Sequence, residues 1–197
     1  MLSLYINLAM QLFFLLTPFF VLSVFLSLTE GMGPAEQRRV ALRTTLAVAI
    51  IGMTLYWAGN PIFSTLGITL DGFRIGAGSL LFLSSVSLVT GTRARAHSTE
   101  GSDMAVVPLA IPITVGPATI GTLLILGAEL SGVVPRLVGA AALLSACVGV
   151  GIILASSRFI GRVLGPMGLS VMTKITGLVL AAMAAQIVFT GVKNFLS

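Results

Sequence analysis

The sequence predicts an all-α membrane protein: six transmembrane helices, arranged as two inverted three-helix repeats, with helices one and four broken near the midplane. Three observations lead to this prediction. The chain has 197 residues, of which 56% are hydrophobic and only 9% are charged, and its mean hydropathy is +1.09. Charge-free runs long enough to cross a bilayer recur along it. The two halves also share a weak repeat, and prolines interrupt the first run of each half.

Six stretches carry no charged side chain for at least eighteen residues: 1–29, 44–70, 75–92, 104–128, 137–157 and 175–192. A helix needs about 20 apolar residues to cross the hydrocarbon core, so each run can hold one span. Closed β-barrels are excluded because the runs lack the alternation of polar and apolar residues that barrel strands need. Run 1–29 has no basic start and is too long for a signal peptide, so we expect a retained helix.

The basic residues predict the orientation of the six spans. Links 1–2, 3–4 and 5–6 share one side of the membrane, and the termini share the other with links 2–3 and 4–5. This eight-to-three split follows the positive-inside rule and predicts a multi-pass protein of the cell inner (cytoplasmic) membrane with both termini on the non-cytoplasmic side. No clustered basic patch indicates nucleic-acid binding. The first side holds Arg38, Arg39, Arg43, Arg93, Arg95, Arg158, Arg162 and Lys174, and the second holds Arg74, Arg136 and Lys193.

A repeat divides the chain into residues 1–92, a polar cytoplasmic linker at 93–103, and residues 104–197. At an offset of 100, the third span of each half aligns, and at an offset of 99 Thr17-Pro18 falls opposite Gly116-Pro117. Chance similarity between apolar helices is the alternative explanation. Because each half holds three spans, a real duplication must be inverted, as in many secondary transporters. The aligned pairs are Arg74 with Lys174, Ile75 with Ile175, Leu80 with Leu180, Thr90-Gly91 with Thr190-Gly191, and Arg93 with Lys193.

The helix breakers of runs 1–29 and 104–128 bear on the location of the site. Pro18 lies just past the middle of 1–29, and Pro117 lies near the middle of 104–128, within "IPITVGPATIG". A proline inside a helix removes a hydrogen bond and costs about 3 kcal/mol. In hydrocarbon, such a break is tolerated only against protein or a wet cavity. Transporters use these breaks to bind substrates, so we expect the site between spans one and four. A structural kink is the alternative, above all for Pro18.

The central thirds of the runs contain no Asp, Glu, Lys, Arg or His, which argues against a carboxylate proton relay and a strongly charged substrate. The remaining hydroxyls, carbonyls and helix dipoles suit a small zwitterionic solute. The alternatives are that the hydroxyls pack helices and that the amide of span six joins helices. The candidate substrate-binding residues are Thr17, Pro18, Thr114, Gly116, Pro117, Thr119 and Gln186.

Enzymatic and metal chemistry is not expected. The single histidine, His97, lies in the linker, Cys147 lies alone within span five, and there is no HExxH motif. We therefore expect no cofactor, while a coupling ion, Na⁺ or H⁺, stays open. Besides the lipid bilayer, the expected partners are the solute and, through the GxxxG spacings Gly72/Gly76 and Gly161/Gly165, a second copy of the chain.

Three segments resemble the MarC family of inner-membrane proteins: "FLSLTEGMGPAEQRRVALR" (25–43), "ITLDGFRIGAGSLLFL" (68–83) and "DMAVVPLAIPITVGPATI" (103–120). The resemblance covers almost the whole chain. The family includes SnatA-type transporters of small neutral amino acids, so it implies transport of glycine or alanine by alternating access. A passive channel, an exporter of other small metabolites or drugs, and an accessory membrane subunit are the alternatives.

The family's second-half motif is present as Ile111, Pro112, Gly116, Pro117 and Ile120. Its first-half counterpart usually has Asp-Pro followed, after one residue, by Gly-Asn. This chain has "TPFFV" there: Pro18 matches, whereas Thr17, Phe20 and Val21 replace the Asp, Gly and Asn. The departure implies a different substrate, a different coupling or a smaller pocket if those positions contact substrate in relatives.

Overall fold

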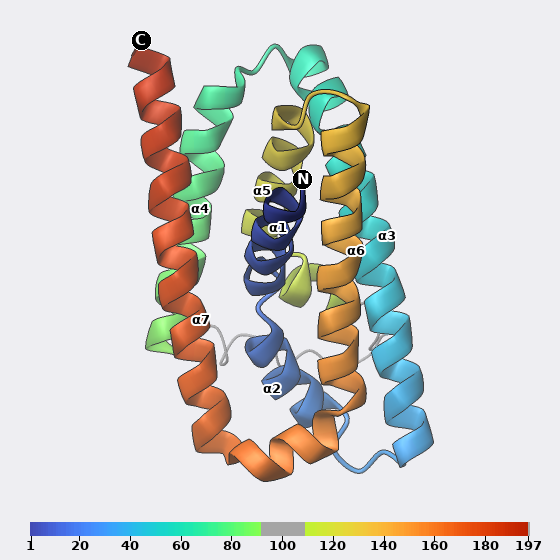
Figure 1. Ribbon diagram of the computed structural model, residues 1–197. Helices are drawn as coiled ribbons and strands as arrows, with labels where there is room; N and C mark the ends of the chain where they lie inside the picture. The colour runs from blue at the N-terminus through green and yellow to red at the C-terminus, as the bar shows by residue number, and fades with distance from the viewer. Residues whose placement is uncertain (92–108, 197) are drawn as a thin grey trace.

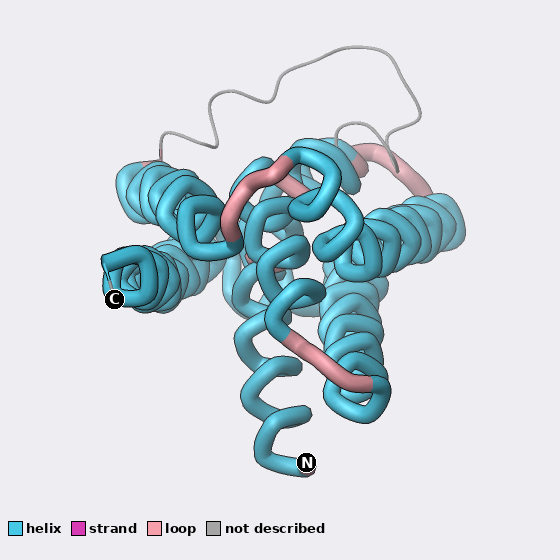
Figure 2. The backbone as a smooth tube through the Cα atoms, turned by 90° about the horizontal axis from the view of Figure 1, so that it is seen from above, coloured by secondary structure: helices cyan, strands magenta, loops and turns pink. Residues whose placement is uncertain are grey.

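The computed structural model describes residues 1–91 and 109–196, so the linker expected at 93–103 lies outside the described residues. Within them the regular structure is helical, without strands (Figure 2). The elements are α1 (Leu2–Leu15), α2 (Pro18–Leu28), α3 (Pro34–Leu66), α4 (Leu70–Thr90), the π-helical turn η2 (Leu109–Thr114), α5 (Pro117–Glu129), α6 (Val133–Ala155) and α7 (Ser157–Leu196).

Five helical stretches among the described residues are long and apolar enough to cross a membrane, with the broken pair α1–α2 counted as one. The protein is therefore an all-α membrane protein, as predicted. The expected fourth span is not a continuous helix in its described part: η2 precedes α5, a shorter apolar helix.

The long helices form two pairs with the broken helices between them. Figure 1 shows α4 beside α7 on one side and α3 beside α6 on the other. Between the pairs, α1 packs on α6, α2 on α7, and α5 on both α3 and α4. Contact between α5 and α3 is closest at Gly127, where an added Cβ would lie 1.8 Å from the Tyr56 carbonyl oxygen. Only glycine fits so close an approach.

Both predicted helix breaks are present. The first lies at Thr17, which caps α2 in the left-handed conformation (φ 48°, ψ 57°) and is the one non-glycine residue with positive φ among those described. The second lies at Gly116, which caps α5 with extended backbone (φ −84°, ψ 176°). Pro18 and Pro117 then occupy the first helical position, where a missing N–H costs nothing. Since α2 packs on η2, the two breaks approach each other in the interior.

Glycines of α4 and α7 pack reciprocally along the seam between these antiparallel helices. A Cβ added at Gly78 would lie 2.7 Å from Val188 Cγ2, and one added at Gly177 would lie 2.9 Å from Val89 Cγ2. Both the glycines and their partners are 99 residues apart in the sequence. The seam is thus built twice from equivalent positions, in a register one residue shorter than the offset of 100 expected for these spans.

The ends of the two half-helices α2 and α5 are also capped from equivalent positions. Gln37 in α3 donates its amide to the Thr29 carbonyl at the end of α2, at 3.0 Å. Arg136 in α6 donates Nε to the Leu130 carbonyl at the end of α5, at 3.0 Å. These side chains, which satisfy carbonyls that a helix end leaves free, are again 99 residues apart.

The acidic Glu36 lies in the first turn of α3, which begins at Pro34. Within the spacing Gly72/Gly76, a Cβ at Gly76 would meet nothing within 4 Å, so Gly76 makes no close packing contact with the described part of the chain. Gly165 likewise faces open space, and its backbone (φ 62°, ψ 178°) instead kinks α7.

Candidate functional site

A cavity of about 300 Å³ lies where α1, α4, α5 and α7 meet, and we name it the Arg74 cavity. Leucine, isoleucine and methionine side chains form its apolar wall. Its size is at the lower end of the range for small-molecule sites, and a few polar groups on an apolar wall are typical of such sites. The polar side chains that line it are Gln11, Arg74, Thr122, Glu129, Gln186 and Thr190.

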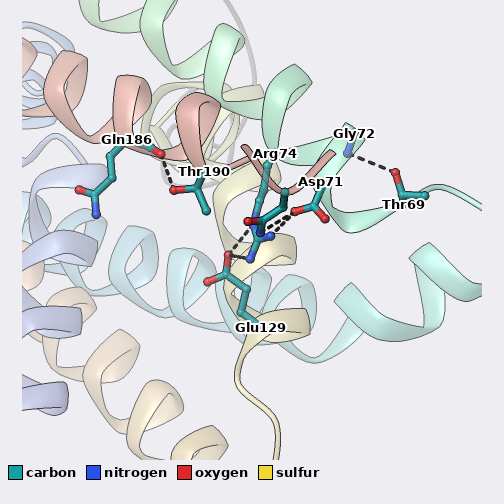
Figure 3. A network of polar contacts seen from close by, with 8 residues as sticks. Thr69, Asp71, Gly72, Arg74, Glu129, Gln186 and Thr190 are labelled. Carbon is teal, nitrogen blue, oxygen red and sulfur yellow. Dashed lines mark hydrogen bonds and ion pairs between the residues drawn. The ribbon is translucent and has the colours of Figure 1, made fainter. Parts of the chain in front are cut away.

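Arg74 holds two carboxylates at the rim of this cavity (Figure 3). Its Nε and Nη2 donate to Glu129 Oε1 at 2.9 and 2.6 Å, and its Nη1 donates to Asp71. The guanidinium is well covered, with 13% of the side chain exposed, whereas Glu129 is 36% exposed. Asn194 at the end of α7 also donates to Asp71, so one cation connects α4, α5 and α7.

The α7 wall of the cavity presents Gln186 and, one turn later, Thr190 (Figure 3). Thr190 donates its hydroxyl to the Gln186 carbonyl at 2.8 Å, which leaves the oxygen of that hydroxyl able to accept. The side-chain amide of Gln186 makes no hydrogen bond to the described part of the protein. An amide in this position offers both a donor and an acceptor to a bound solute.

Of the predicted site residues, Gln186 lines the Arg74 cavity. Thr17, Pro18, Thr114, Gly116 and Thr119 lie instead in the buried region around the two helix breaks. There Thr114 donates to the Leu109 carbonyl at 2.7 Å, and Thr119 reaches only weakly toward the Thr114 carbonyl at 3.4 Å. Thr17 is 3% exposed, and its hydroxyl has no hydrogen-bond partner among the described residues.

Pro117 is exposed and borders a different hollow, an apolar groove of about 470 Å³ between α4 and α5. No polar side chain lines this groove, so it cannot orient a polar solute. The smaller Arg74 cavity is the better candidate site despite its size.

Sequence reasoning missed most of the cavity's polar groups. Arg74 and Glu129 stand at the ends of the predicted spans, outside the central thirds of the charge-free runs, where an ionisable residue would indicate a site. The spacing of three residues between Asp71 and Arg74 was the one signal of an ion pair in the sequence, and the two side chains do form one. Their approach to Glu129, 55 residues away, had no local signal.

A second, smaller cavity of about 240 Å³ lies between α2, α4 and α7, and we name it the Lys174 cavity. Its polar side chains are hydroxyls and one ammonium group. They belong to Ser23, Ser87, Ser170, Thr173 and Lys174.

Comparison with known protein families gives a match over almost the whole chain. Residues 2–196 match the description "MarC family integral membrane protein". The chain belongs to the MarC family. The expected resemblance is thereby confirmed, and the MarC protein described here is a multi-pass integral membrane protein.

Curated relatives of this MarC protein are similar over nearly their full length. A UPF0056 membrane protein of Aquifex aeolicus is 31% identical over 98% of this chain and 94% of its own. One from Methanocaldococcus jannaschii is 32% identical over 94% of each chain. The UPF0056 inner membrane protein YhgN of Escherichia coli is 28% identical over 97% of each. No solved structure matches.

Proposed function

We propose that this MarC protein is a secondary transporter of small neutral amino acids, of the glycine and alanine type, that works by alternating access without enzymatic chemistry or a cofactor. The observation that carries the proposal is the Arg74 cavity. It brings an ion pair, a free amide and two hydroxyls together around one hollow between α1, α4, α5 and α7.

The charges of the cavity suit a zwitterion better than an ion. The charged side chains that line the cavity, Arg74 and Glu129, have opposite signs, whereas Asp71, the second carboxylate bound by Arg74, does not line it. The lining therefore offers charged groups of both signs. A zwitterion brings a carboxylate and an ammonium group together. Its ammonium can meet Glu129, of which one oxygen already accepts from Arg74, and can donate to the hydroxyl oxygen of Thr190, while its carboxylate can accept from the side-chain amide of Gln186.

Equivalent contacts at a spacing of 99 residues support the proposed inverted repeat of residues 1–92 and 104–197. The reciprocal glycines Gly78 and Gly177 occupy twin positions at the seam, and the capping side chains Gln37 and Arg136 occupy twin positions on α3 and α6. The packing of α2 on α7 repeats that of α5 on α4. Inverted repeats that rock against each other are a common basis of alternating access.

A carrier is favoured over an open channel by the layer between the two cavities. Leu81 of α4 and Leu180 of α7 lie between the cavity residues of their helices, and they are 2% and 1% exposed. The two cavities share no lining residue. Passage of a solute therefore requires helices to move.

The first helix break supports a binding role near the site. Thr17 is a β-branched residue in the left-handed region, so its backbone is strained, and its buried hydroxyl has no hydrogen-bond partner among the described residues. We propose that Thr17, with the N-termini of α2 and α5, interacts with the solute carboxylate or with a coupling ion while solute crosses. Within this proposal the positive-inside distribution places both termini on the non-cytoplasmic side of the inner membrane.

Counterflow in proteoliposomes tests the function. Vesicles loaded with unlabelled alanine should take up labelled alanine or glycine in a saturable transient, which a passive channel does not produce. Gln186→Leu should lose most of the uptake, because leucine keeps the bulk of glutamine but offers no hydrogen bond. Thr54→Val, on an exposed face of α3 away from both cavities, is the control.

Absence of counterflow for every small neutral amino acid tried, from protein that is monodisperse and inserted, would overturn the substrate assignment. A flux that rises linearly with concentration would instead indicate a channel.

A further inference from the structure

The Lys174 cavity has no role in the proposed binding step, yet it is built from positions equivalent to those of the Arg74 cavity. Five of its nine lining residues are paired, at a spacing of 99, with residues that line the Arg74 cavity. The pairs are Ser23 with Thr122, Ser87 with Gln186, Leu88 with Ile187, Gly91 with Thr190, and Thr173 with Arg74.

The helices that form the two cavities correspond in the same way, with α2 in one cavity in the place of α5 in the other. The Arg74 cavity lies between α5 and the α4/α7 pair, whereas the Lys174 cavity lies between α2 and that pair. Chance placement of two hollows does not explain a common register on all three helices. The two cavities therefore occupy twin places in the architecture.

The cavities lie toward opposite ends of the α4/α7 pair. Arg74 and Ser87 on α4 are 13 residues apart, which is about 20 Å along a helix. On the antiparallel α7 the order is reversed, with Lys174 near Ser87 and Thr190 near Arg74. Leu81 and Leu180, which are 2% and 1% exposed, lie between the two sets of lining residues along their helices.

We propose that the Lys174 cavity is a second binding site for the same small zwitterionic solute, reached from the membrane face opposite to the one that serves the Arg74 cavity. This inference rests on the proposed transport function and names the second half of the solute's path. A solute released from one cavity into the interior meets the other before it leaves the protein.

The chemistry of the Lys174 cavity suits the carboxylate end of the solute. Lys174 supplies an ammonium group and Ser23 a hydroxyl, and both can donate to a carboxylate. The hydroxyls of Ser87 and Thr173 already donate to carbonyls of their own helices, so they can only accept from the solute. Among the residues that the structure describes, no carboxylate lines this cavity or pairs with Lys174. Hydrogen bonds between an ammonium and a carboxylate are about twice as strong as neutral ones.

Cysteine accessibility in sealed vesicles tests the proposal. The chain has a single cysteine, the buried Cys147, so Cys147→Ala gives a background without thiols. Into it we would introduce the twin pair Gln186→Cys and Ser87→Cys. A second pair, Thr122→Cys and Ser23→Cys, covers the case in which one variant fails to fold. Each is treated with a membrane-impermeant maleimide from either face, with and without saturating alanine.

We expect the two members of each pair to be labelled from opposite faces, and alanine to slow labelling of both several-fold. Ser79→Cys is the control. It is an exposed serine of α4 that lines neither cavity, so alanine should not change its labelling.

Labelling of both members from the same face overturns the inference. So does protection by alanine of Gln186→Cys but not of Ser87→Cys. In either case counterflow by the background protein would persist, and the proposed transport function would stand. Loss of counterflow together with loss of protection at every position would instead remove the proposed function, and this inference with it.

Discussion

The Arg74 cavity and the Lys174 cavity are built from equivalent positions, but their charges differ. In the first, Arg74 of α4 is tied to Glu129 at the end of α5. In the second, Glu30 follows α2 at the position 99 residues before Glu129, yet within the described residues Glu30 and Lys174 form no ion pair. The spacing of 99 residues therefore relates the linings of the two cavities, whereas it does not relate their ionic contacts. The difference indicates that α5 is fastened to α4 in this conformation and that α2 is not fastened to α7 in the same way.

The helices beside the cavities differ as well. α1 is a helix of 14 residues that lines the Arg74 cavity with Gln11, Leu12 and Leu15. Its counterpart η2 is a π-helical turn in the described part and lines neither cavity. Among the described residues, α1 therefore lines one of the two cavities, while its counterpart lines neither.

The seam that both cavities share is where the largest effect is expected. Gly78→Leu and Gly177→Leu should each destabilise the protein by about 3 kcal/mol, because a larger side chain forces α4 and α7 apart. Thermal melting in detergent measures this, with Gly76→Leu as the control because that position faces open space. Similar losses at Gly78 and Gly177 would sharpen the comparison. Melting of Gly78→Leu at the temperature of the control would contradict the reciprocal packing.

The next largest expected difference is between the stabilities of two variants, each of which lacks the cation of one cavity. Arg74→Ala should cost about 2 kcal/mol, because it leaves two carboxylates without their partner. Lys174→Ala should change stability by less than about 0.5 kcal/mol, because Lys174 is exposed and makes no ion pair within the described residues. Chemical unfolding of both variants under identical conditions checks the contrast, and equal losses would refute it.

A smaller effect is expected from one hydroxyl of the Arg74 cavity. Thr190→Val should raise the apparent KM for alanine about five-fold, the equivalent of one lost hydrogen bond of about 1 kcal/mol. Thr54→Val removes an identical bond within a helix, since both hydroxyls donate to a carbonyl four residues back at 2.8 Å. If the two variants transport equally, Thr190 does not contact the solute.

The last prediction concerns the first helix break, at Thr17. Thr17→Gly should raise stability by about 1 kcal/mol, because glycine adopts the left-handed conformation without strain. Thr17→Ala removes the hydroxyl but keeps the strain, so it separates the two contributions. We expect both variants to lose transport. Full transport by Thr17→Ala would show that the hydroxyl has no role.

Much of this fold could be predicted from composition and local pattern. The charge-free runs predicted the long helices, and prolines preceded by Thr17 and Gly116 marked both breaks, because each of these signals is contained within a few residues. Gln186 was found because a lone amide within an apolar run stands out. Other features depend on which helix faces meet. The pairing of Arg74 with Glu129, the packing of Gly78 and Gly177, and the register of 99 arise only when separate helices come together.

The kink of α7 at Gly165 bears on how the protein sits in its bilayer. Before the kink, α7 crosses one end of the molecule, and after it the helix runs along the molecule's length (Figure 1). The crossing segment bears Arg158 and Arg162 next to the exposed Phe159, and such mixed segments settle at the headgroup level. Its depth is then fixed by lipid, while the rest of α7 carries residues of both cavities. Under the proposed transport function, bilayer thickness becomes a mechanical input to solute passage, acting through the tilt of a single helix.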